Sequence, residues 1–524
     1  MINEENISLM ERYNSVLLIS SERRNPMGEA EVEKKKVLGT APIIAIAMAL
    51  IGPAAYGVGF FPAMLGEGTG PVLALPILKG TIACIFTAIS VAVLALKFAY
   101  SGGAYSYSRE ALGVHAGFMV GWATVLAYFF LPTAGALFAG VYGDIFISSL
   151  MGVPGGTYAY LDILIAIIAA LVMLLIAYRG VEAGGLTMEL VLIVQIVLVF
   201  IIALWALTAI PPNANLAAPF DPSFTSWSGA ESGDLGIIMT AGFLFFFAFY
   251  GFDGTVVFAG EAKNPYRSCA LGAVLCILIV GAIYVFWAWA MMLPYSGDVA
   301  TFTTMQDAVI AAGDVSPLAE TAGEAWFGSA NTGVSILSGA MLLSALGSGT
   351  AAALTISRIL QAMGADEVLP KTLGKSHPKY ASPYTAAMLV GIVTVLIPVV
   401  TYFMGMALID TFIFTATWCA WGVLIMYFFM NVDNLFISAK KITGKSFILG
   451  IIVPIIGAAL MGYIWWSSGS AGIPGIAEAS AFEGGPIWNT MMTPGFIWMA
   501  IGFIYLIYLR VAKKEVLERG ITAV

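Results

Sequence analysis

The residues best suited to chemistry lie between Gly242 and Arg267, where a carboxylate interrupts an apolar run rich in phenylalanine. Asp253 stands beside Gly251 and Gly254, near the middle of a run that is long enough to enter a bilayer. A carboxylate at membrane depth costs on the order of a few kcal/mol, so it usually faces a partner or a water-filled cavity. The glycines favour an unwound helix, which a membrane tolerates only where the backbone is buried in protein or lines a cavity.

A second interruption lies in the first apolar segment, in the sequence Ile51-Gly52-Pro53-Ala54-Ala55-Tyr56-Gly57-Val58-Gly59-Phe60-Phe61-Pro62. Two prolines and three glycines in this stretch are incompatible with an uninterrupted helix. The half-helix beyond the break offers free backbone N–H groups and a positive dipole end, which suit a substrate carboxylate. A kinked and simply packed helix is the alternative interpretation. Two broken helices in corresponding places of two halves are typical of a secondary transporter.

The composition requires a membrane-embedded scaffold for these stretches. The 524 residues are 60% hydrophobic and 10% charged, against roughly 45–50% and 25% in soluble domains. We predict twelve segments of about 20 residues or more, enough to span a bilayer. They lie at about 38–65, 72–98, 117–149, 160–178, 184–210, 235–260, 269–293, 332–360, 384–404, 408–430, 446–467 and 493–510. The breaks fall five spans apart, so we expect an all-α, five-plus-five inverted-repeat core with discontinuous helices 1 and 6, followed by two further helices.

The charges predict the orientation of these spans. The net charge is −8, but the long loops near 211–234, 294–331 and 468–492 contain no Lys or Arg, and the basic residues gather in the alternate loops. This asymmetry places both termini in the cytoplasm of a multi-pass cell-membrane protein. The expected organisation is a cytoplasmic tail over 1–36, a ten-helix core over 37–430, two helices over 431–510 and a tail over 511–524. Lys79, in the second segment, either reaches the outer interface or pairs with a carboxylate such as Asp144.

Several functional classes find no support in the sequence. It contains no His-Glu-x-x-His, no Gly-x-Ser-x-Gly and no phosphate-binding loop, and it has only two histidines, so we predict that it is not an enzyme. The four cysteines lack metal-ligand spacing, so no metal, cofactor or disulfide is expected, and nothing points to nucleic acid. A channel would need a repeated filter element. A substrate-sensing receptor is a weaker alternative, because the N-terminal tail is short for an output domain.

Three further motifs, together with the two breaks, resemble the amino acid–polyamine–organocation transporter superfamily. They are Ser101-Gly102-Gly103-Ala104-Tyr105 with Arg109-Glu110-Ala111-Leu112-Gly113 and Gly121-Trp122; Phe249-Tyr250-Gly251-Phe252-Asp253 with Glu261-Ala262-Lys263-Asn264-Pro265; and Ser357-Arg358-Ile359-Leu360 with Leu369-Pro370-Lys371 and His377-Pro378-Lys379-Tyr380. The resemblance covers about residues 38–430. It implies import, export or exchange of amino acids or related amines by alternating access, as a symporter or an exchanger. An amine or polyamine antiporter is the alternative.

The resemblance also suggests which residues bind the substrate. The expected set is Gly52, Ala54, Ala55, Tyr56, Gly57, Phe247, Phe249, Tyr250, Gly251 and Asp253. Ala55 and Tyr56 replace the Gly-Ser that many members carry, so Tyr56 changes the space available for the substrate. The carboxylate of the substrate is expected to bind N–H groups around Ala55–Gly57, and the amine of the substrate is expected to bind carbonyl groups near Phe249–Gly251.

Coupling to an ion is a separate question. Gln195 stands where some proton-coupled relatives carry a lysine, and a glutamine cannot hold a charge. The coupling candidates are the Gln195 position itself, a proton on Glu189 or Asp253, Na⁺ near Ser344 and Ser348, or exchange without an ion. For Asp253 we weigh two hypotheses. It either switches, being protonated when the cavity closes without an amine and ionised when the cavity is wet or occupied, or it is a structural carboxylate that caps the broken helix.

Overall fold

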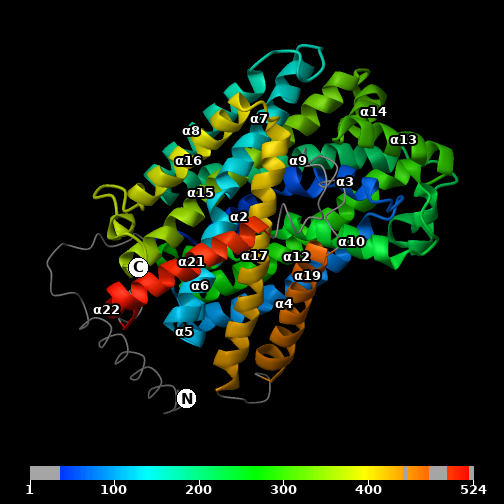
Figure 1. The fold of residues 1–524 in the computed structure, drawn as a ribbon. Coiled ribbons are helices and arrows are strands. Elements are labelled where there is room, and N and C mark those ends of the chain that lie inside the picture. Colours follow the sequence, from blue (N-terminus) through cyan, green and yellow to red (C-terminus); the bar gives the residue numbers. More distant parts are fainter. Residues whose placement is uncertain (1–35, 441–446, 471–492, 519–524) are drawn as a thin grey trace, which may run out of the picture. The chain divides into compact units, whose positions relative to one another are not determined.

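The computed structural model describes residues 36–440, 447–470 and 493–518, and within these ranges the chain is helical, with no strand (Figure 1). Eleven helical stretches of this part are long and apolar enough to cross a membrane. They are Thr40–Val58, Ala74–Lys97, Val114–Leu150, Leu161–Arg179, Met188–Thr208, Pro265–Tyr295, Ala330–Ala365, Tyr384–Phe403, Leu408–Ala439, Ile448–Trp465 and Pro494–Ala512. Each falls on a segment that the sequence predicts.

The remaining predicted segment, the sixth along the chain near 235–260, is absent from that set because its helix is broken. It begins with α10 (Leu235–Phe246), passes through a short 3-10 turn, η4 (Phe247–Phe249), and resumes as α11 (Gly254–Val257). The first segment is also divided, into α2 (Thr40–Ile51), a π-helical turn η1 (Pro53–Val58) and α3 (Phe61–Gly66). The prediction that helices 1 and 6 are discontinuous is therefore confirmed.

Helices from the two predicted halves pack on their counterparts. The second span α4 (Ala74–Lys97) packs on the seventh, α12 (Pro265–Met292), and α8 (Leu161–Arg179) packs on α16 (Tyr384–Phe403), as Figure 1 shows. The third span, formed by α6 (Val114–Phe129) and α7 (Leu131–Leu150), packs through α7 on the eighth, α15 (Ala330–Ala365). Contact between elements five spans apart is the arrangement expected when two inverted halves surround one axis.

Small residues bring α7 and α15 close together. A Cβ added at Gly135 would lie 2.7 Å from the Cα of Gly349, so Gly135 has no room for a side chain. Small residues on the facing sides of the two helices thus serve close helix packing. They also let α15 reach the first break, as described below.

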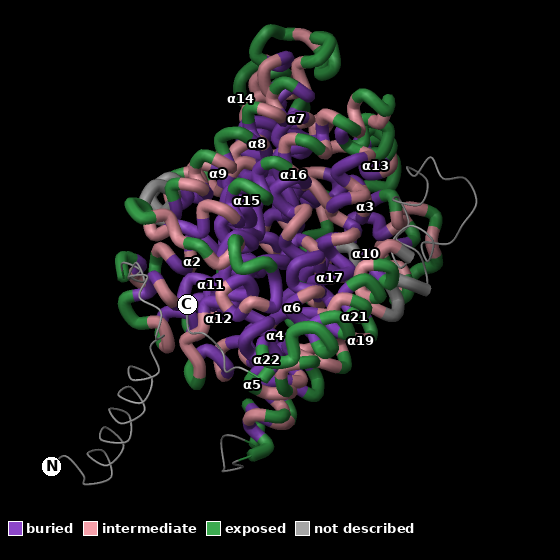
Figure 2. Tube along the Cα trace, turned by 60° about the vertical axis from the view of Figure 1, so that its left-hand side comes forward, coloured by how far each residue is buried: buried purple, intermediate pink, exposed green. Residues whose placement is uncertain are grey.

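Burial follows the membrane setting. The purple core in Figure 2 lies inside the bundle, whereas large apolar side chains remain exposed along its outer helices. On α8 these are Leu164, Ile168, Leu171, Val172 and Leu175. Apolar side chains at such positions are stable against lipid tails, which are as apolar as leucine. These findings support a multi-pass membrane protein.

The last two membrane spans lie against the core. These are α19 (Val453–Ser470) and α21 (Thr493–Ala512), and α21 is held on α6 by two tryptophans. The indole of Trp122 donates to the Trp498 carbonyl at 2.7 Å, and the indole of Trp498 donates to the Trp122 carbonyl at 2.9 Å. Their rings also stack, with centroids 4.8 Å apart. Buried indole N–H groups normally require such a partner.

Two stretches differ from expectation. The stretch near 100–113, predicted as a loop, contains the helix α5 (Ala104–Leu112). The tenth span, α17 (Leu408–Ala439), continues nine residues beyond the predicted end at 430, so the domain boundary expected at 430/431 falls inside a helix. The long loop after the seventh span holds α13 (Val299–Ala312) and α14 (Ser316–Phe327). The fifth span is α9 (Val181–Thr208). The predicted N-terminal tail, up to residue 35, lies outside the described residues.

Candidate functional site

The first break is fixed by a glycine that no other residue can replace without strain. Gly52 ends α2 with φ +65°, in the left-handed region that side chains disfavour. A Cβ at this position would also lie 2.9 Å from the ring of Tyr56 and 3.1 Å from the Cβ of Ser348. The local sequence and the neighbouring helix α15 therefore both require glycine here.

Side chains of two other spans hold the backbone of η1. The N–H of Ala54 donates to Oε1 of Gln195 on α9 at 3.3 Å, and the N–H of Ala55 donates to Oγ of Ser344 on α15 at 3.0 Å. The hydroxyl of Ser348 donates to the carbonyl of Leu50 at 2.8 Å. The structure thus brings three of the expected coupling residues, Gln195, Ser344 and Ser348, to this break. A substrate carboxylate on these two N–H groups would have to replace Gln195 and Ser344.

Two polar atoms at the break are buried without a hydrogen-bond partner within the described part of the chain. They are the hydroxyl of Tyr56 and Nε2 of Gln195. The Ser348 hydroxyl lies near that of Tyr56 and donates its own proton to the Leu50 carbonyl. Because buried polar groups are nearly always hydrogen-bonded, such atoms mark a place for a water molecule or a ligand.

Aromatic side chains line the other side of Tyr56. Its ring centroid lies 5.8 Å from that of Phe138 on α7 and 6.3 Å from that of Phe412 on α17, and the latter two lie 4.7 Å apart. Tyr56 is only 7% exposed. Tyr56 therefore fills space at this point of the bundle, as its size predicts, and combines an apolar wall with an available hydroxyl.

The second break faces the first. Tyr250 is extended, Gly251 has φ +123°, and a Cβ at Gly251 would lie 2.8 Å from Cγ of Leu50. Gly254 approaches the same side chain, with its Cβ position 2.7 Å from Cδ2 of Leu50. Since Leu50 is the residue before the end of α2, the two interruptions meet directly, and η1 packs against η4.

Asp253 is held by two tyrosines that the sequence analysis does not identify. Its Oδ1 accepts hydrogen bonds from the hydroxyls of Tyr128 on α6 and Tyr427 on α17, each at 2.7 Å. The Tyr427 hydroxyl also accepts the N–H of Gly251 at 3.1 Å. The carboxylate thus ties the break of helix 6 to helices 3 and 10. No cation pairs with it among the residues that the structure describes.

Tyr284 on α12 is another residue that sequence reasoning missed. Its hydroxyl donates to the carbonyl of Ala248 at 3.0 Å, and its ring lies 5.3 Å from that of Phe249. A Cβ added at Gly57 would collide with the same ring. Tyr284 therefore occupies space between the two breaks, and Gly57 is needed for its packing. Of the remaining expected residues, Tyr250 donates to the carbonyl of Ala127, and Phe247 is partly buried.

Two charged residues singled out from the sequence lie apart from the breaks. Glu189 is half-buried on α9, nearly two turns before Gln195. Lys79 is half-buried on α4, and its suggested partner Asp144 instead accepts from Ser148 at 3.3 Å and from the backbone N–H of Gly156. The pairing of Lys79 with Asp144 is therefore not formed.

Buried ion pairs close the end of the bundle at which helix 6 leaves the core. Arg358 on α15 donates to Glu261 at 2.8 Å, and its guanidinium lies 4.6 Å from the centroid of the Phe258 ring. The backbone of Leu38 joins this cluster. Its N–H donates to the backbone carbonyl of Glu261 at 3.0 Å, and its carbonyl accepts the backbone N–H of Lys263 at 2.8 Å. The starts of helices 1 and 7 are thereby connected.

A second pair anchors α5 at the same end. Arg109 forms a buried ion pair with Asp366, and the hydroxyl of Tyr105 donates to the same carboxylate at 2.7 Å. Burial, and next the negative charge of Asp366, raise the pKa of Tyr105, so its hydroxyl stays a donor at neutral pH. Arg109, Glu261, Arg358 and their neighbours appear in the sequence motifs, but their pairing is visible only in the structure.

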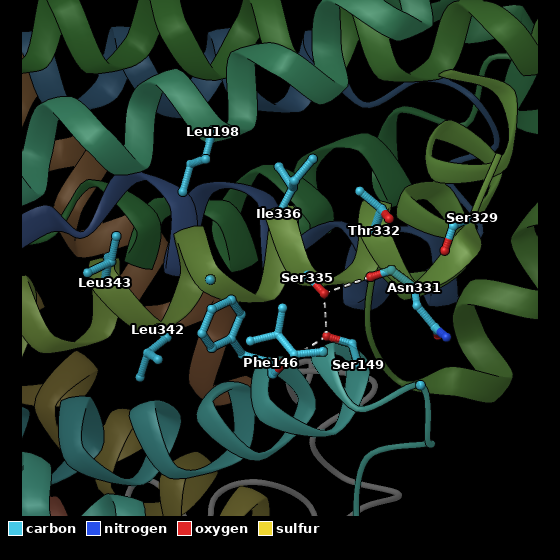
Figure 3. A pocket seen from close by; sticks show the side chains of 13 residues that line it. Phe146, Ser149, Leu198, Ser329, Asn331, Thr332, Ser335, Ile336, Leu342 and Leu343 are labelled. Atoms are coloured by element: carbon cyan, nitrogen blue, oxygen red, sulfur yellow. Dashed lines mark hydrogen bonds between the residues drawn. The ribbon is translucent and has the colours of Figure 1, made fainter. Parts of the chain in front are cut away.

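A separate groove lies between α7, α9 and α15 (Figure 3). It encloses about 650 Å³. Hydroxyls of Ser149 and Ser335 hydrogen-bond to each other at 2.8 Å in its middle. Ser329 and Asn331 lie toward one end, and Leu198, Leu342 and Leu343 lie toward the other. The groove opens on the flank of the bundle and does not include any residue of the two breaks.

Comparisons with known proteins agree with this architecture. A family model described as "Amino acid permease" matches residues 38–465. The chain is similar to the low-affinity putrescine importer PlaP of Escherichia coli K12, with 27% identity covering 91% of this chain and 94% of that protein. It is 26% identical to the branched-chain amino acid permease BcaP of Bacillus subtilis, over 70% and 75% of the two chains. A methylthioribose transporter of Bacillus subtilis is 24% identical over 71% and 77%.

Proposed function

Because this chain belongs to the amino acid permease family, we propose that it is a secondary transporter that moves an amino acid or a related amine by alternating access. The facing breaks of helices 1 and 6 carry this proposal. They place unwound backbone, a carboxylate and unpartnered polar atoms together inside a membrane-spanning bundle, where irregular backbone is stable only if it lines a site or is covered by protein.

The proposed substrate site lies between η1 and the stretch from Phe247 to Gly251. Free polar atoms of Tyr56 and Gln195 are available to a ligand there, and the ring of Tyr56 with Phe138 and Phe412 forms an apolar wall. A zwitterion with a small apolar side chain has the same combination of groups. This supports an amino acid substrate.

The donors at the first break suggest how such a substrate enters. Its carboxylate takes the N–H groups of Ala54 and Ala55 from Gln195 and Ser344, and the freed amide of Gln195 then donates to the carboxylate. The amine binds carbonyl groups exposed near Phe249–Gly251. A diamine lacks the carboxylate and would leave both side-chain contacts intact, so amine-only transport, as in the putrescine importer, is the second candidate.

Closure at the α5 end supports alternating access. The pairs Arg358–Glu261 and Arg109–Asp366 are buried in this conformation. For the substrate to leave on that side they must separate, which makes them the proposed gate. The asymmetric distribution of basic residues supports a cytoplasmic location for this end and for both termini.

The test is counterflow in proteoliposomes loaded with unlabelled leucine or putrescine, with the labelled compound added outside. We expect labelled leucine to accumulate transiently. Tyr56→Phe keeps the ring and removes the hydroxyl, which should raise KM for leucine by about 2- to 10-fold, the value of one hydrogen bond. Tyr463→Phe, at a half-exposed position on α19, is the matched control. If neither compound shows counterflow, or if Tyr56→Phe behaves as the control does, the proposal fails.

Gly57→Val is a poor probe of this site. The valine would displace Tyr284, so loss of transport would follow from disturbed packing as well as from loss of a binding surface. Gln195→Met is a cleaner change, since it keeps the length of the side chain and removes both polar atoms. We expect it to weaken leucine counterflow more than putrescine counterflow.

A further inference from the structure

A second buried carboxylate lies outside the site at the breaks. Asp433, on the extended end of α17, has 0% exposure. Its Oδ2 lies 2.6 Å from the hydroxyl of Ser108 on α5. Its Oδ1 is buried and has no hydrogen-bond partner in the described ranges.

No charge offsets this carboxylate within the part of the chain that the structure describes. The elements packed against α17 are α4, α5, α6, α7, α16, α19, α21 and η8 (Ile448–Ile452). Their acidic and basic residues are Lys79, Lys97, Arg109, Glu110, His115, Asp144 and Arg510. Lys97 donates to Ser438, Arg109 pairs with Asp366, and Asp144 binds Ser148. Glu110, His115 and Arg510 are exposed, and Lys79 is on the far half of α4.

The tyrosines of α5, α6 and α17 are also engaged elsewhere. On α5, Tyr105 donates to Asp366, and Tyr107 lies 3.5 Å from the carbonyl of Phe98. On α6 and on α17 itself, Tyr128 and Tyr427 donate to Asp253. Ser108 is thus the single hydrogen-bond partner of Asp433 within the described residues.

The surroundings of Asp433 and Ser108 favour a bound proton. An ionised carboxylate with one donor and one bare oxygen is costly to bury, by several kcal/mol. A neutral carboxyl removes that cost, because the bound proton cancels the charge while the hydroxyl of Ser108 stays hydrogen-bonded to Oδ2. Na⁺ is a poor fit, because hard cations require several oxygen ligands and this position offers two side chains.

We propose that Asp433, with Ser108, is the proton-binding site that couples this transporter to a proton gradient. The inference rests on the transport function proposed above and adds its coupling ion. The step is a simple protonation: a proton from water joins the carboxylate when the site is open and leaves to water from the carboxylic acid when it next opens. Ser108 is a positioning residue that sets the hydrogen bond of the acid.

The position of α5 provides the link to conformation. Arg109, next to Ser108, pairs with Asp366 at the end of α15, so α5 joins α17 and α15 by two adjacent side chains. Glycines with positive φ flank the helix, Gly103 at +57° and Gly113 at +94°. Such residues let a short helix change direction at both ends. Opening the gate at Arg109 therefore draws Ser108 away from Asp433 and exposes the carboxyl to water.

Infrared difference spectroscopy on the purified full-length protein in liposomes tests this without any substrate. The spectra are recorded while the pH is changed, and they report protonated carboxyl groups by their C=O stretch. We expect one carboxyl band that grows as the pH falls and is lost in Asp433→Asn. In Ser108→Ala the same band should persist at a shifted frequency, because the acid loses its hydrogen-bond partner.

Two controls keep the assignment specific. Asp253→Asn should retain the band, and Ser357→Ala, which removes a buried hydroxyl bound to its own helix at Ala353, should leave its frequency unchanged. If Asp433→Asn titrates as the unmodified protein does, or if Ser108→Ala leaves the frequency unaltered, the proposal is overturned.

Proton movement itself is measured with a pH-sensitive dye trapped in proteoliposomes during addition of leucine or putrescine. Asp433→Asn should keep counterflow and lose substrate-dependent acidification. Acidification equal to that of the unmodified protein would overturn the coupling role. Absence of counterflow in the unmodified protein would defeat the transport proposal alone, and the infrared result would still decide whether Asp433 binds a proton.

Discussion

Asp253 and Asp433 are the same residue type, equally hidden from solvent at 2% and 0% exposure, yet their surroundings differ. Asp253 accepts two tyrosine hydroxyls on one oxygen, and one of these tyrosines also binds the backbone of the break. Asp433 has a single serine and one oxygen without a partner. Neither has a cation beside it in the described residues.

If Asp433 binds a proton as proposed, the donors around a carboxyl, more than its burial, separate a structural role from an ion-binding one. Hydrogen bonds to a charged group are worth about 1.5–3 kcal/mol each. Two such bonds favour an ionised Asp253 in a structural role, although its side chain makes no capping hydrogen bond to the backbone of α11. A single hydrogen bond offsets less of the free-energy cost of burying a charge, so the protonated form of Asp433 is more stable than the ionised form.

The largest expected effect comes from a third carboxylate, Glu261, whose partner is a full cation. Arg358→Met should destabilise the protein by about 3–5 kcal/mol, because it leaves a buried charge without its partner. The thermal midpoint in detergent at one fixed scan rate measures this loss. The double variant Arg358→Met with Glu261→Gln should recover a large part of it. A single variant as stable as the unmodified protein would show that this end is open in solution.

The next effect concerns Asp253 itself. Asp253→Asn should cost about 2–4 kcal/mol, since two hydrogen bonds to a charge are replaced by weaker ones. If the carboxylate is structural, the remaining exchange activity keeps the pH profile of the unmodified protein. A flattened profile would instead support the switching hypothesis and would remove the contrast with Asp433.

The two tyrosines sharpen the same contrast. Tyr128→Phe removes one donor to Asp253, and should cost about 1.5–3 kcal/mol. Tyr427→Phe removes a donor and also the acceptor of the Gly251 N–H, so its loss of thermal stability should be larger. Equal losses for the two variants would mean that the Gly251 contact contributes little to the break.

The smallest effect is expected at Asp433. If this side chain is a neutral carboxyl, Asp433→Asn is nearly isosteric and should change stability by less than about 1 kcal/mol at neutral pH. The comparison is made with Asp253→Asn in the same detergent and scan. A loss as large as that of Asp253→Asn would indicate that Asp433 is ionised and structural.

Much of the architecture follows from local features of the chain. Long apolar segments predict the spans, and the Gly and Pro residues around Gly52 and Gly251 predict the two breaks, which the structure confirms. The tenth span shows where this reasoning fails. Its apolar pattern is diluted by Asn431, Asp433 and Asn434, so the prediction ends at 430, although the helix continues to Ala439. Apolar residues at Leu435, Phe436 and Ile437 are the signal that could have extended it.

The site residues divide in the same way. Gln195, Ser344 and Ser348 were selected from the sequence, and all three contact the first break or the helix end before it. Tyr128, Tyr284 and Tyr427 were not selected, because a tyrosine in an apolar span has no local sign of which way its hydroxyl points. Glu189 was selected for its charge alone and lies away from both breaks.

Hydrophobic length and backbone preference act over a few neighbouring residues, so local patterns specify where this chain crosses the membrane and where its helices break. What each break contacts, and which groups hydrogen-bond to each buried carboxyl, depends on helices that are distant in the chain. Asp253 meets tyrosines from helices 3 and 10, and Asp433 meets a serine from a short helix far away in the chain. Hydrogen bonds of this kind depend on the rotation and packing of whole helices, which no local pattern specifies.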